Sequence, residues 1–280
     1  MAGMLYLVPT PIGNLGDISL RARQTLEAAD FIAAEDTRVT LKLLNHLEIK
    51  KNLVSYYEHN KNFKGSRIVE RILAGETCAL VSDAGSPAIS DPGEDLVREC
   101  AQAGITVCAI PGPCAAITAL SISGQPTGRF CFEGLLSMSK KSRREHLDSL
   151  RAEKRTMIFY EAPHKLMNTL EDMTEVFGQD RAISFCRELT KLHEEVIRTT
   201  LGQAIVHFTE TPPKGEFVLV VAGAPEEVKE APTSVDAAAR VNELMEQGLS
   251  RKDAIKQTAK ELDLPKNAVY AAALGEEASD

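Results

Sequence analysis

Short apolar runs and amphipathic segments alternate along the first half of the chain. Apolar runs with the length of buried strands occupy 5–8, 31–34, 52–55, 77–81 and 105–110. Segments with apolar residues at helical spacing lie between and after them, at 19–29, 63–74, 94–103 and 115–122. Strand, crossover helix and strand in repetition predict an α/β fold with a mainly parallel sheet.

A second α/β unit is predicted after residue 124. Its extended runs lie at 130–133, 157–160, 182–186, 195–199 and 216–221, and its helical segments at 143–150, 164–176 and 201–207. An acidic, proline-bearing linker at 224–232 then precedes helical segments at 235–247, 251–262 and 266–274. The last two are joined by a Leu-Asp-Leu-Pro turn and resemble a helix-turn-helix. We therefore expect domains at 1–123, 124–224 and 233–275.

Two elaborate loops follow consecutive predicted strands. Residues 82–93 read Ser-Asp-Ala-Gly-Ser-Pro-Ala-Ile-Ser-Asp-Pro-Gly, and residues 111–116 read Pro-Gly-Pro-Cys-Ala-Ala. A connection of two or three residues would join such elements, so the first loop is more than a connector. Either loop alone is credible as a structural turn. The pair indicates a small-ligand site at the carboxyl ends of the strands.

Composition narrows the class of protein. The chain has 280 residues, 44% of them hydrophobic, and a net charge of −8, so wholesale attraction to nucleic acid is not expected. Its six cysteines include no C-x-x-C pair, and no histidine is spaced to complete a zinc site. The start lacks the pattern of a signal peptide, and no apolar run approaches the ~20 residues of a membrane span. We expect a soluble, cytoplasmic protein with no metal site.

Common catalytic motifs are absent. The sequence contains no G-x-G-x-x-G after a strand, no G-x-x-x-x-G-K-[ST] and no G-x-S-x-G. ATP hydrolysis, ordinary dinucleotide binding, the common methyltransferase class and an esterase elbow are therefore all disfavoured. Loops rich in proline and aspartate instead present backbone groups in fixed directions, which suits a polar, largely uncharged ligand edge.

Seven ordered motifs carry a family resemblance. They are LVPTPIGNLGD at 7–17, AAEDTR at 33–38, SDAGSP at 82–87, PGPCAAITAL at 111–120, FYEAPHK at 159–165, RELTK at 187–191 and KGEFVLVV at 214–221. Together they resemble the tetrapyrrole methylase superfamily, the class III S-adenosylmethionine methyltransferases. Within it they are similar to the bacterial enzymes that methylate a cytidine ribose 2′-hydroxyl in 16S ribosomal RNA near the decoding site. The resemblance implies S-adenosylmethionine in a cleft between two α/β domains, and a homodimer.

The resemblance also implies cofactor-binding positions. Matched motif by motif, they are Pro11, Ser82, Asp83, Ala84, Gly85, Ser86, Cys114, Ala115, Ala116, Tyr160, Val221 and Ala222. Tetrapyrrole enzymes carry Gly-Asp-Pro where this chain has Ser-Asp-Ala, which favours the ribosomal substrate. Two alternatives stay open: a same-fold methylase acting on a tetrapyrrole or a protein side chain, and a non-catalytic RNA-binding assembly factor.

Methyl transfer to a hydroxyl needs in-line placement and an acceptor for the hydroxyl proton. The acidic candidates in the motifs are Glu35, Asp36, Glu161 and Glu188, of which Asp36 and Glu161 are favoured. Each lies near cations of its own motif: Arg38, His164, Lys165, Arg187 and Lys191. One interpretation makes the acid a base and the cation an RNA anchor. The other makes each pair a structural ion pair.

RNA binding needs local positive charge. Residues 139–155 hold seven cations and three anions, with Lys140, Lys141, Arg143 and Arg144 clustered at the start. The candidate RNA contacts are these four residues with Arg38, Lys165, Arg187 and Lys191. A solvated helix face carries the same pattern. A small macrocycle would need neither this cluster nor a basic helical tail, so both features favour 16S ribosomal RNA or the small subunit as partner.

Overall fold

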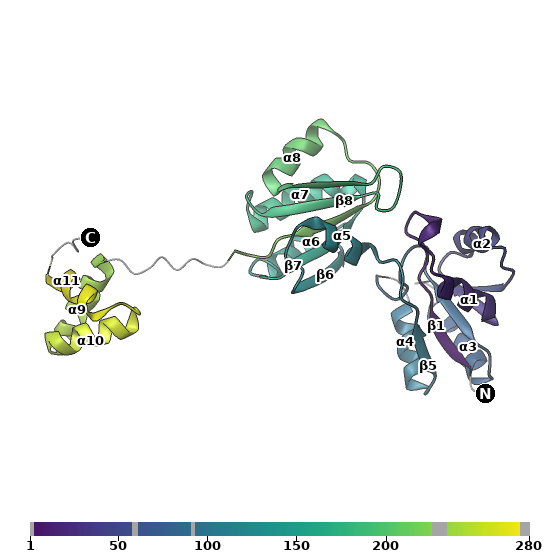
Figure 1. Ribbon diagram of the computed structural model, residues 1–280, viewed down its shortest axis with the longest axis horizontal. Helices are drawn as coiled ribbons and strands as arrows, with labels where there is room; N and C mark the ends of the chain where they lie inside the picture. The colour runs from purple at the N-terminus through teal and green to yellow at the C-terminus, as the bar shows by residue number, and fades with distance from the viewer. Residues whose placement is uncertain (1–2, 58–60, 91–92, 226–233, 275–280) are drawn as a thin grey trace. The chain divides into compact units, whose positions relative to one another are not determined.

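The computed structural model describes residues 3–57, 61–90, 93–225 and 234–274. The chain divides into two compact units, Met1–Pro225 and Glu226–Asp280. Figure 1 shows both α/β sheets in the first unit and three helices in the second. No helix in the described ranges has the length and apolar character to cross a membrane.

The first sheet is entirely parallel, as the alternating pattern predicts. Its strands are β1 (Met4–Leu7), β2 (Phe31–Ala34), β3 (Asn52–Ser55), β4 (Cys78–Val81) and β5 (Thr106–Ala109). They lie in the order β3-β2-β4-β1-β5. The apolar runs of β2 and β4 are buried along their whole length, as expected of strands covered on both faces.

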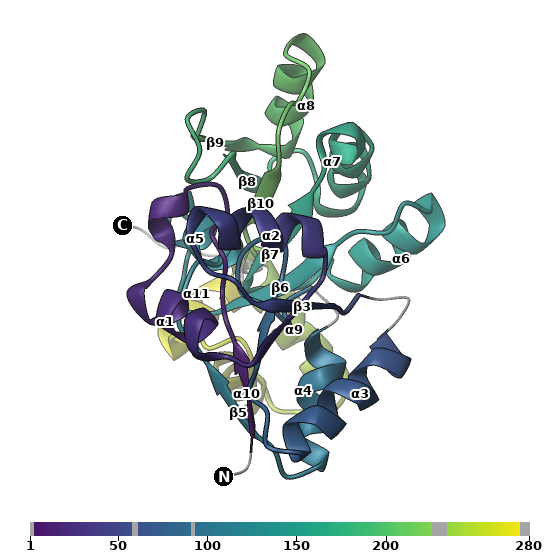
Figure 2. The ribbon, with the colours of Figure 1, turned by 90° about the vertical axis from the view of Figure 1, so that its right-hand side faces the viewer.

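Helices cover both faces of this sheet. They are α1 (Leu20–Ala28), α2 (Thr37–His46), α3 (Lys61–Leu73) and α4 (Gly93–Gln102), with a short 3₁₀ turn, η1 (Leu15–Asp17), before α1. Buried side chains of α1 and α2 share one hydrophobic cluster, and those of α3 and α4 share another. Figure 2 shows α3 and α4 side by side. The sequence pattern did not predict α2.

The second sheet is mixed. Its strands are β6 (Phe130–Leu135), β7 (Thr156–Glu161), β8 (Ala182–Arg187), β9 (Glu195–Thr200) and β10 (Phe217–Val221), in the order β6-β7-β10-β8-β9. Strands β6 and β7 are parallel, and the other neighbours are antiparallel. Because β10 runs opposite to β7, Phe217 pairs with Glu161 at one end and Val221 with Met157 at the other.

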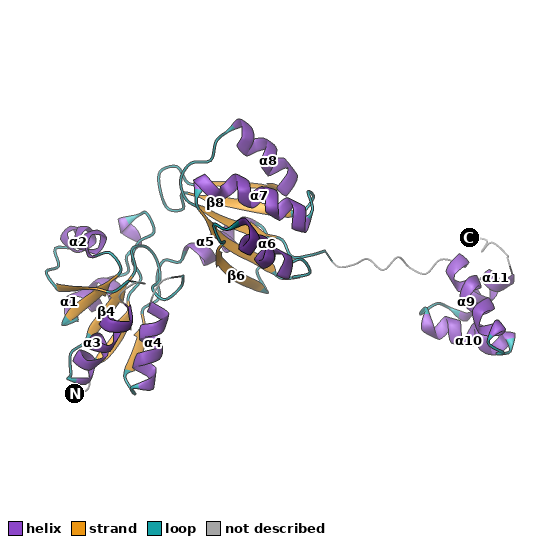
Figure 3. Cartoon of the chain, turned by 180° about the vertical axis from the view of Figure 1, so that it is seen from behind, coloured by secondary structure: helices purple, strands orange, loops and turns teal. Residues whose placement is uncertain are grey.

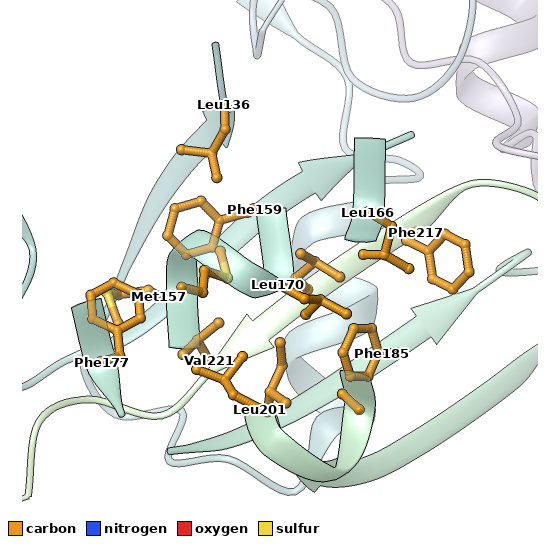
Figure 4. Packing of buried hydrophobic residues seen from close by; sticks show 14 of the residues in the cluster. Leu136, Met157, Phe159, Leu166, Leu170, Phe177, Phe185, Leu201, Phe217 and Val221 are labelled. Atoms are coloured by element: carbon orange, nitrogen blue, oxygen red, sulfur yellow. The ribbon is translucent and has the colours of Figure 1, made fainter. Parts of the chain in front are cut away.

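One face of this sheet carries α6 (Lys140–Ser149), α7 (Pro163–Phe177) and α8 (Leu201–Glu210), which Figure 3 shows as a layer of helices on the strands. The cluster between them includes Phe159, Phe185 and Phe217, all at most 2% exposed (Figure 4). Burying a side chain of this size contributes about 1.5–3 kcal/mol.

The opposite face is covered by α5 (Ala115–Ser123), which follows β5 of the first sheet. Its residues Ala116, Ala119 and Leu120 pack on Ile158 and Val218 of the second sheet. The predicted boundary after residue 123 therefore does not follow the packing, because the helix before it belongs to the second core.

The second unit is a small three-helix domain. Its helices are α9 (Ser234–Glu246), α10 (Arg251–Glu261) and α11 (Lys266–Leu274). They enclose a core that contains Val241, Leu244, Ile255 and Val269. Ser250 caps α10 by accepting the Asp253 N–H at 3.2 Å, as the sequence pattern indicates.

Candidate active site

Hydrogen bonds join three loops at the carboxyl ends of β1, β4 and β5. Thr10 N donates to Gly85 O at 2.9 Å, and Gly85 N donates to Thr10 O at 3.0 Å. The Thr10 hydroxyl donates to Ser82 O at 3.1 Å, and the Ser86 hydroxyl donates to Pro113 O at 2.9 Å. Because β4, β1 and β5 are neighbours, the loops form one surface at the edge where open α/β sheets bind ligands.

A cavity of about 350 Å³ opens beside these loops. Side chains and backbone of the loops form one wall, which includes Ile12, Ala84, Gly85, Ser86, Cys114 and Ala115. The second sheet and its loops form the other wall, which includes Leu135, Tyr160, Glu161, Leu189, Lys191, Glu216 and Val218. Cofactor sites typically occupy about 300–1,000 Å³, and the volume of this cavity lies in the lower part of that range. It is large enough for a ligand of nucleoside size.

Backbone strain concentrates at this cavity. Among the described residues that are not glycine, six have positive φ, and four of these lie in its two border loops. Ala88 and Ser90 follow β4, with φ of 66° and 63°, while Glu188 and Thr190 follow β8, with φ of 51° and 66°. Such conformations cost about 1–3 kcal/mol each and are typical of functional loops.

Close contacts join the two sheets' loops at the border of the cavity. A Cβ built on Gly13 would lie 2.6 Å from Cγ of Lys191, and one on Gly134 would lie 3.5 Å from Oγ of Ser90. Since Lys191 and Ser90 both line the cavity, the loop after β1 meets the loop after β8, and the loop after β4 meets the end of β6.

Glu161 brings a buried carboxylate to the cavity at the end of β7, where it is 3% exposed. Its Oε1 lies 3.1 Å from Lys165 Nζ and accepts the Ala162 N–H at 2.9 Å. Its Oε2 accepts the Thr169 hydroxyl at 2.6 Å. Four residues therefore act together at the start of α7: the charge of the acid is balanced by a lysine one helical turn away, and both its oxygens are hydrogen-bonded.

Tyr160 connects the two halves of the cavity wall. Its hydroxyl accepts the Ala116 N–H at 3.1 Å, which ties β7 to the first turn of α5. The Phe132 ring packs edge-on against the Tyr160 ring at 5.0 Å between centroids. The tyrosine is therefore held in one orientation at the point where the first sheet's last loop enters α5.

Comparison with known proteins supports the resemblance that the motifs carry. Residues 4–205 match the family model described as Tetrapyrrole (Corrin/Porphyrin) Methylases. The chain belongs to the tetrapyrrole methylase family. Residues 231–277 match the model described as RsmI C-terminal HTH domain, which agrees with the helix-turn-helix predicted for the tail.

Several proteins match this chain over nearly the full length of both sequences. A protein of Synechocystis sp. named Ribosomal RNA small subunit methyltransferase I is 49% identical, and the match covers 99% of each chain. A protein of Escherichia coli O157:H7 with the same name is 45% identical over 97% of this chain and 95% of its own.

Solved structures with the same fold include a diphthine synthase, with a TM-score of 0.62 and 14% identity over 79% of this chain and 90% of that one. They also include a uroporphyrin-III-C-methyltransferase from Thermus thermophilus, with a TM-score of 0.56 and 20% identity over 78% of this chain and 94% of that one. At these identities the likeness extends to the fold alone.

The structure brings half of the predicted cofactor positions to the cavity: Ala84, Gly85, Ser86, Cys114, Ala115 and Tyr160. Pro11 precedes Ile12, which lines it. The Ser82 hydroxyl donates to Gly85 O at 3.3 Å and thus shapes the loop from beneath. Asp83 accepts the Asp36 N–H at 3.0 Å.

Two predicted cofactor positions are separated from this cavity. Val221 is the last residue of β10 and Ala222 follows it, whereas the cavity is lined by Phe217 and Val218 at the beginning of β10. The antiparallel pairing of β10 with β7 places Val221 opposite Met157, at the other end of the sheet from Tyr160. The two residues therefore lie away from this cavity, because β10 begins at the cavity and ends at the opposite end of the sheet.

Of the four acidic candidates, only Glu161 lines the cavity. Asp36 caps α2, and hydrogen bonds from the Arg38 side chain and backbone lower the pKa of Asp36 to about 2. Glu188 accepts the Glu216 N–H at 3.0 Å and lies 3.0 Å from Lys191 Nζ, and these bonds lower its pKa. Glu35 borders a separate small cavity behind the loop that follows β4.

The predicted basic cluster at the start of α6 divides in two. Lys140 and Lys141 are exposed. Arg143 is 6% exposed and pairs with Asp172 at 2.7 Å, so the prediction that it contacts RNA is wrong: its charge is already neutralised inside the protein. Arg144 pairs with Asp172 and with Glu175.

The other predicted RNA contacts are placed as follows. Arg38 is exposed beside Asp36, and Arg187 pairs with Glu195 at 2.9 Å. Lys165 pairs with Glu161, and Lys191 pairs with Glu188 and Glu216.

The cavity residues that the sequence did not predict are Ile12, Ile89, Ser90, Leu135, Ala162, Pro163, Cys186, Leu189, Glu216, Phe217 and Val218. Ile12, Ile89 and Leu189 lie inside or beside the quoted motifs, so an apolar residue in a polar loop was a usable signal. Leu135 lies outside every motif. Its place depends on how β6 pairs with β7, which the sequence pattern does not specify.

Proposed function

We propose that this chain transfers a methyl group from S-adenosylmethionine to the ribose 2′-hydroxyl of a cytidine in 16S ribosomal RNA, near the decoding site. We further propose that it works as a homodimer in the cytoplasm. The observation that carries the proposal is the near full-length match, at 45–49% identity, to proteins named Ribosomal RNA small subunit methyltransferase I. The match includes the helical tail, which a cavity for a small macrocycle does not require.

The cavity suits the proposed cofactor. Gly85 has φ of +84° and no side chain, so backbone groups of the joined loops reach the cavity surface beside Ser86 and Ala115. Tyr160 and Val218 supply an opposite wall that is largely apolar. S-adenosylmethionine, when bound, supplies an electrophilic methyl group on a sulfonium. The role of these residues is to orient it and to keep water away from the transfer.

Of the four candidate acids, Glu161 is the proton acceptor that the cavity favours, since Glu35, Asp36 and Glu188 lie outside it. The Glu216 carboxylate also lines the cavity but pairs with Lys191 at 2.8 Å. Thr169 and Lys165 hold its carboxylate in one orientation at the cavity wall. Replacing Thr169 with valine removes one donor to Oε2. If Glu161 accepts the hydroxyl proton, Glu161→Gln lowers the single-turnover rate at least tenfold, whereas Thr169→Val, which keeps the carboxylate, lowers it less.

Unchanged single-turnover rates in Glu161→Gln, Asp36→Asn, Glu35→Gln and Glu188→Gln would exclude direct base catalysis by all four acids. An equal loss of rate in Glu161→Gln and Thr169→Val would assign Glu161 a positioning role instead.

The deciding experiment measures cofactor binding and methyl transfer separately. Calorimetry should detect S-adenosylmethionine binding, and labelled methyl groups should appear in small subunits from a strain that lacks this activity. Mass mapping of the RNA should place the label on a ribose 2′-oxygen. Label on uroporphyrinogen, or binding without any transfer to RNA, would contradict the proposed substrate.

A further inference from the structure

Two large aliphatic side chains of the cavity wall are exposed, and a third exposed apolar side chain follows three residues after one of them. Ile89 is 46% exposed and Leu135 is 59% exposed, and both line the cavity. Met138, just after β6, is 72% exposed. The contact between Gly134 and Ser90 brings the residues next to Leu135 and Ile89 together from opposite sheets. Clustered apolar side chains at the mouth of a site mark a binding surface.

The segment that presents Leu135 and Met138 is held from within. Leu136, between them, is 3% exposed, and its side chain points toward Phe159 in the core (Figure 4). Lys165 Nζ donates to Leu136 O at 3.3 Å. The buried side chain of Leu136 thus holds this segment against the core, while the side chains of Leu135 and Met138 are exposed.

Arg143 supplies the second support. Its NH1 donates to Ser137 O at 3.2 Å and to Met138 O at 3.4 Å. Its Nε donates to Asp172 Oδ2 at 2.8 Å, inside the protein. The arginine expected to bind RNA directly therefore anchors the exposed segment. The lysine paired with Glu161 anchors it too, which links the rim to the cavity interior.

A 2′-hydroxyl reaches the inside of the cavity only if its nucleotide enters, and a nucleotide whose base is stacked has to leave the stack to do so. Enzymes that do chemistry on a base rotate the nucleotide out in this way, and proteins that unstack bases insert Leu, Ile or Met side chains at the opened step. Exposed apolar groups in and near the cavity wall suit that task. The exposed Lys140 and Lys141, two and three residues after Met138, suit the flanking phosphates.

We propose that Ile89, Leu135 and Met138 form an apolar wedge that fills the gap in the RNA stack while the target nucleotide occupies the cavity. This inference rests on the proposed function and adds to it the surface that extracts the nucleotide. The ligand class is a purine or pyrimidine base next to the methylated position, contacted on its face.

The test compares Leu135→Ala/Met138→Ala with Leu73→Ala. Leu73, at the end of α3, has the same 59% exposure as Leu135 and lies outside the cavity lining, so it controls for loss of an exposed leucine. Single-turnover methylation is measured on small subunits reconstituted with natural RNA, and on subunits carrying an abasic nucleotide beside the methylated position. Removing that base removes most of the stacking that the wedge has to replace.

We expect the double variant to methylate natural RNA at least tenfold more slowly at saturating S-adenosylmethionine, a condition under which any loss of cofactor affinity at Leu135 does not enter the rate. The abasic substrate should restore most of the rate, and Leu73→Ala should match the unaltered chain on both RNAs. Equal rates for the double variant and the unaltered chain on natural RNA would overturn the wedge. So would an equal loss on both RNAs. If the unaltered chain methylates neither RNA, the proposed function itself fails, which is a distinguishable result.

Discussion

Thr10 and Gly85 each donate a backbone N–H to the other's carbonyl oxygen, at 2.9 and 3.0 Å, and this pair of bonds joins the loops that follow β1 and β4. The bridge lies outside both strands, so it is a property of the loops themselves. Gly85 accommodates it with φ of +84°, where a side chain is disfavoured.

Gly85→Ala should weaken S-adenosylmethionine binding at least tenfold. The new Cβ would lie 3.3 Å from Ile12 in the cavity wall, and the backbone would be strained by about 1–2 kcal/mol. Calorimetry measures the effect. Gly104→Ala is the matched control, because Gly104 also has positive φ, 71°, but a Cβ there meets nothing within 4 Å. Equal cofactor affinity in both variants would contradict a role for the Gly85 loop in binding.

Alkylation of Cys114 should be slowed by the cofactor, because Cys114 is partly exposed and lines the cavity. Cys108, partly exposed outside that lining, is an internal reference whose labelling should not change. Burial raises the pKa of Cys78 to about 12 and that of Cys186 to about 11, so both should remain unlabelled at neutral pH. Mass spectrometry of peptides reads all four sites. Labelling of Cys114 at one rate with and without cofactor would place the cofactor elsewhere.

Reversing the charge of Lys140 and Lys141 should weaken RNA binding and reduce its salt dependence. Each lost phosphate contact lowers the slope of log K against log salt by about 0.7–0.9, so the double variant should lose about 1.4–1.8. Filter binding over a salt series measures this slope. Lys42→Glu, on the exposed part of α2, is the control. A slope that stays at the unaltered value would remove α6 from the interface.

Asp172→Asn should destabilise the unit that contains both sheets by about 3–5 kcal/mol at neutral pH, since it leaves Arg143 buried without its partner. Burial alone would raise the pKa of Asp172, but hydrogen bonds from Arg144 and Arg143 outweigh it and lower that pKa. A lowered pKa means that the folded chain binds this proton less readily than the unfolded chain. The contribution is therefore complete above pH ~4 and is lost as pH falls through the folded value.

Urea unfolding between pH 7 and pH 3 checks both effects. The free energy of unfolding should fall less steeply with acid in Asp172→Asn than in the unaltered chain. Parallel acid limbs would mean that the Asp172 charge does not contribute to stability.

The order of strands and loops was readable from the sequence because buried strands and crossover helices have different periods. Helix α2 was not predicted, and Asp36 was considered only as a possible base. Its side chain instead accepts the Arg38 N–H at 2.8 Å, the bond of a helix cap. Val39, Leu43 and Leu47 follow Asp36 at helical spacing, which is a second indication of a helix in this segment.

The parts of the site contributed by the second sheet were harder to predict. Val221 was placed at the cavity from its motif, but local sequence does not give the direction in which β10 pairs with β7. Arg143 was counted with its exposed neighbours, although Leu147, one turn later, is buried on the same side of α6. A cation in line with a core leucine indicates a buried partner, and Asp172 lies 29 residues away in sequence.

Helix α5 leaves the last strand of one sheet and packs into the core of the other. Its residues are apolar almost throughout, so neither half of the first unit is self-sufficient. If the chain were cut after Ser123, the amino-terminal piece would expose an apolar helix. The remainder would have one face of its sheet uncovered. An exchange of either half between relatives would therefore have to carry α5 together with the sheet on which it packs.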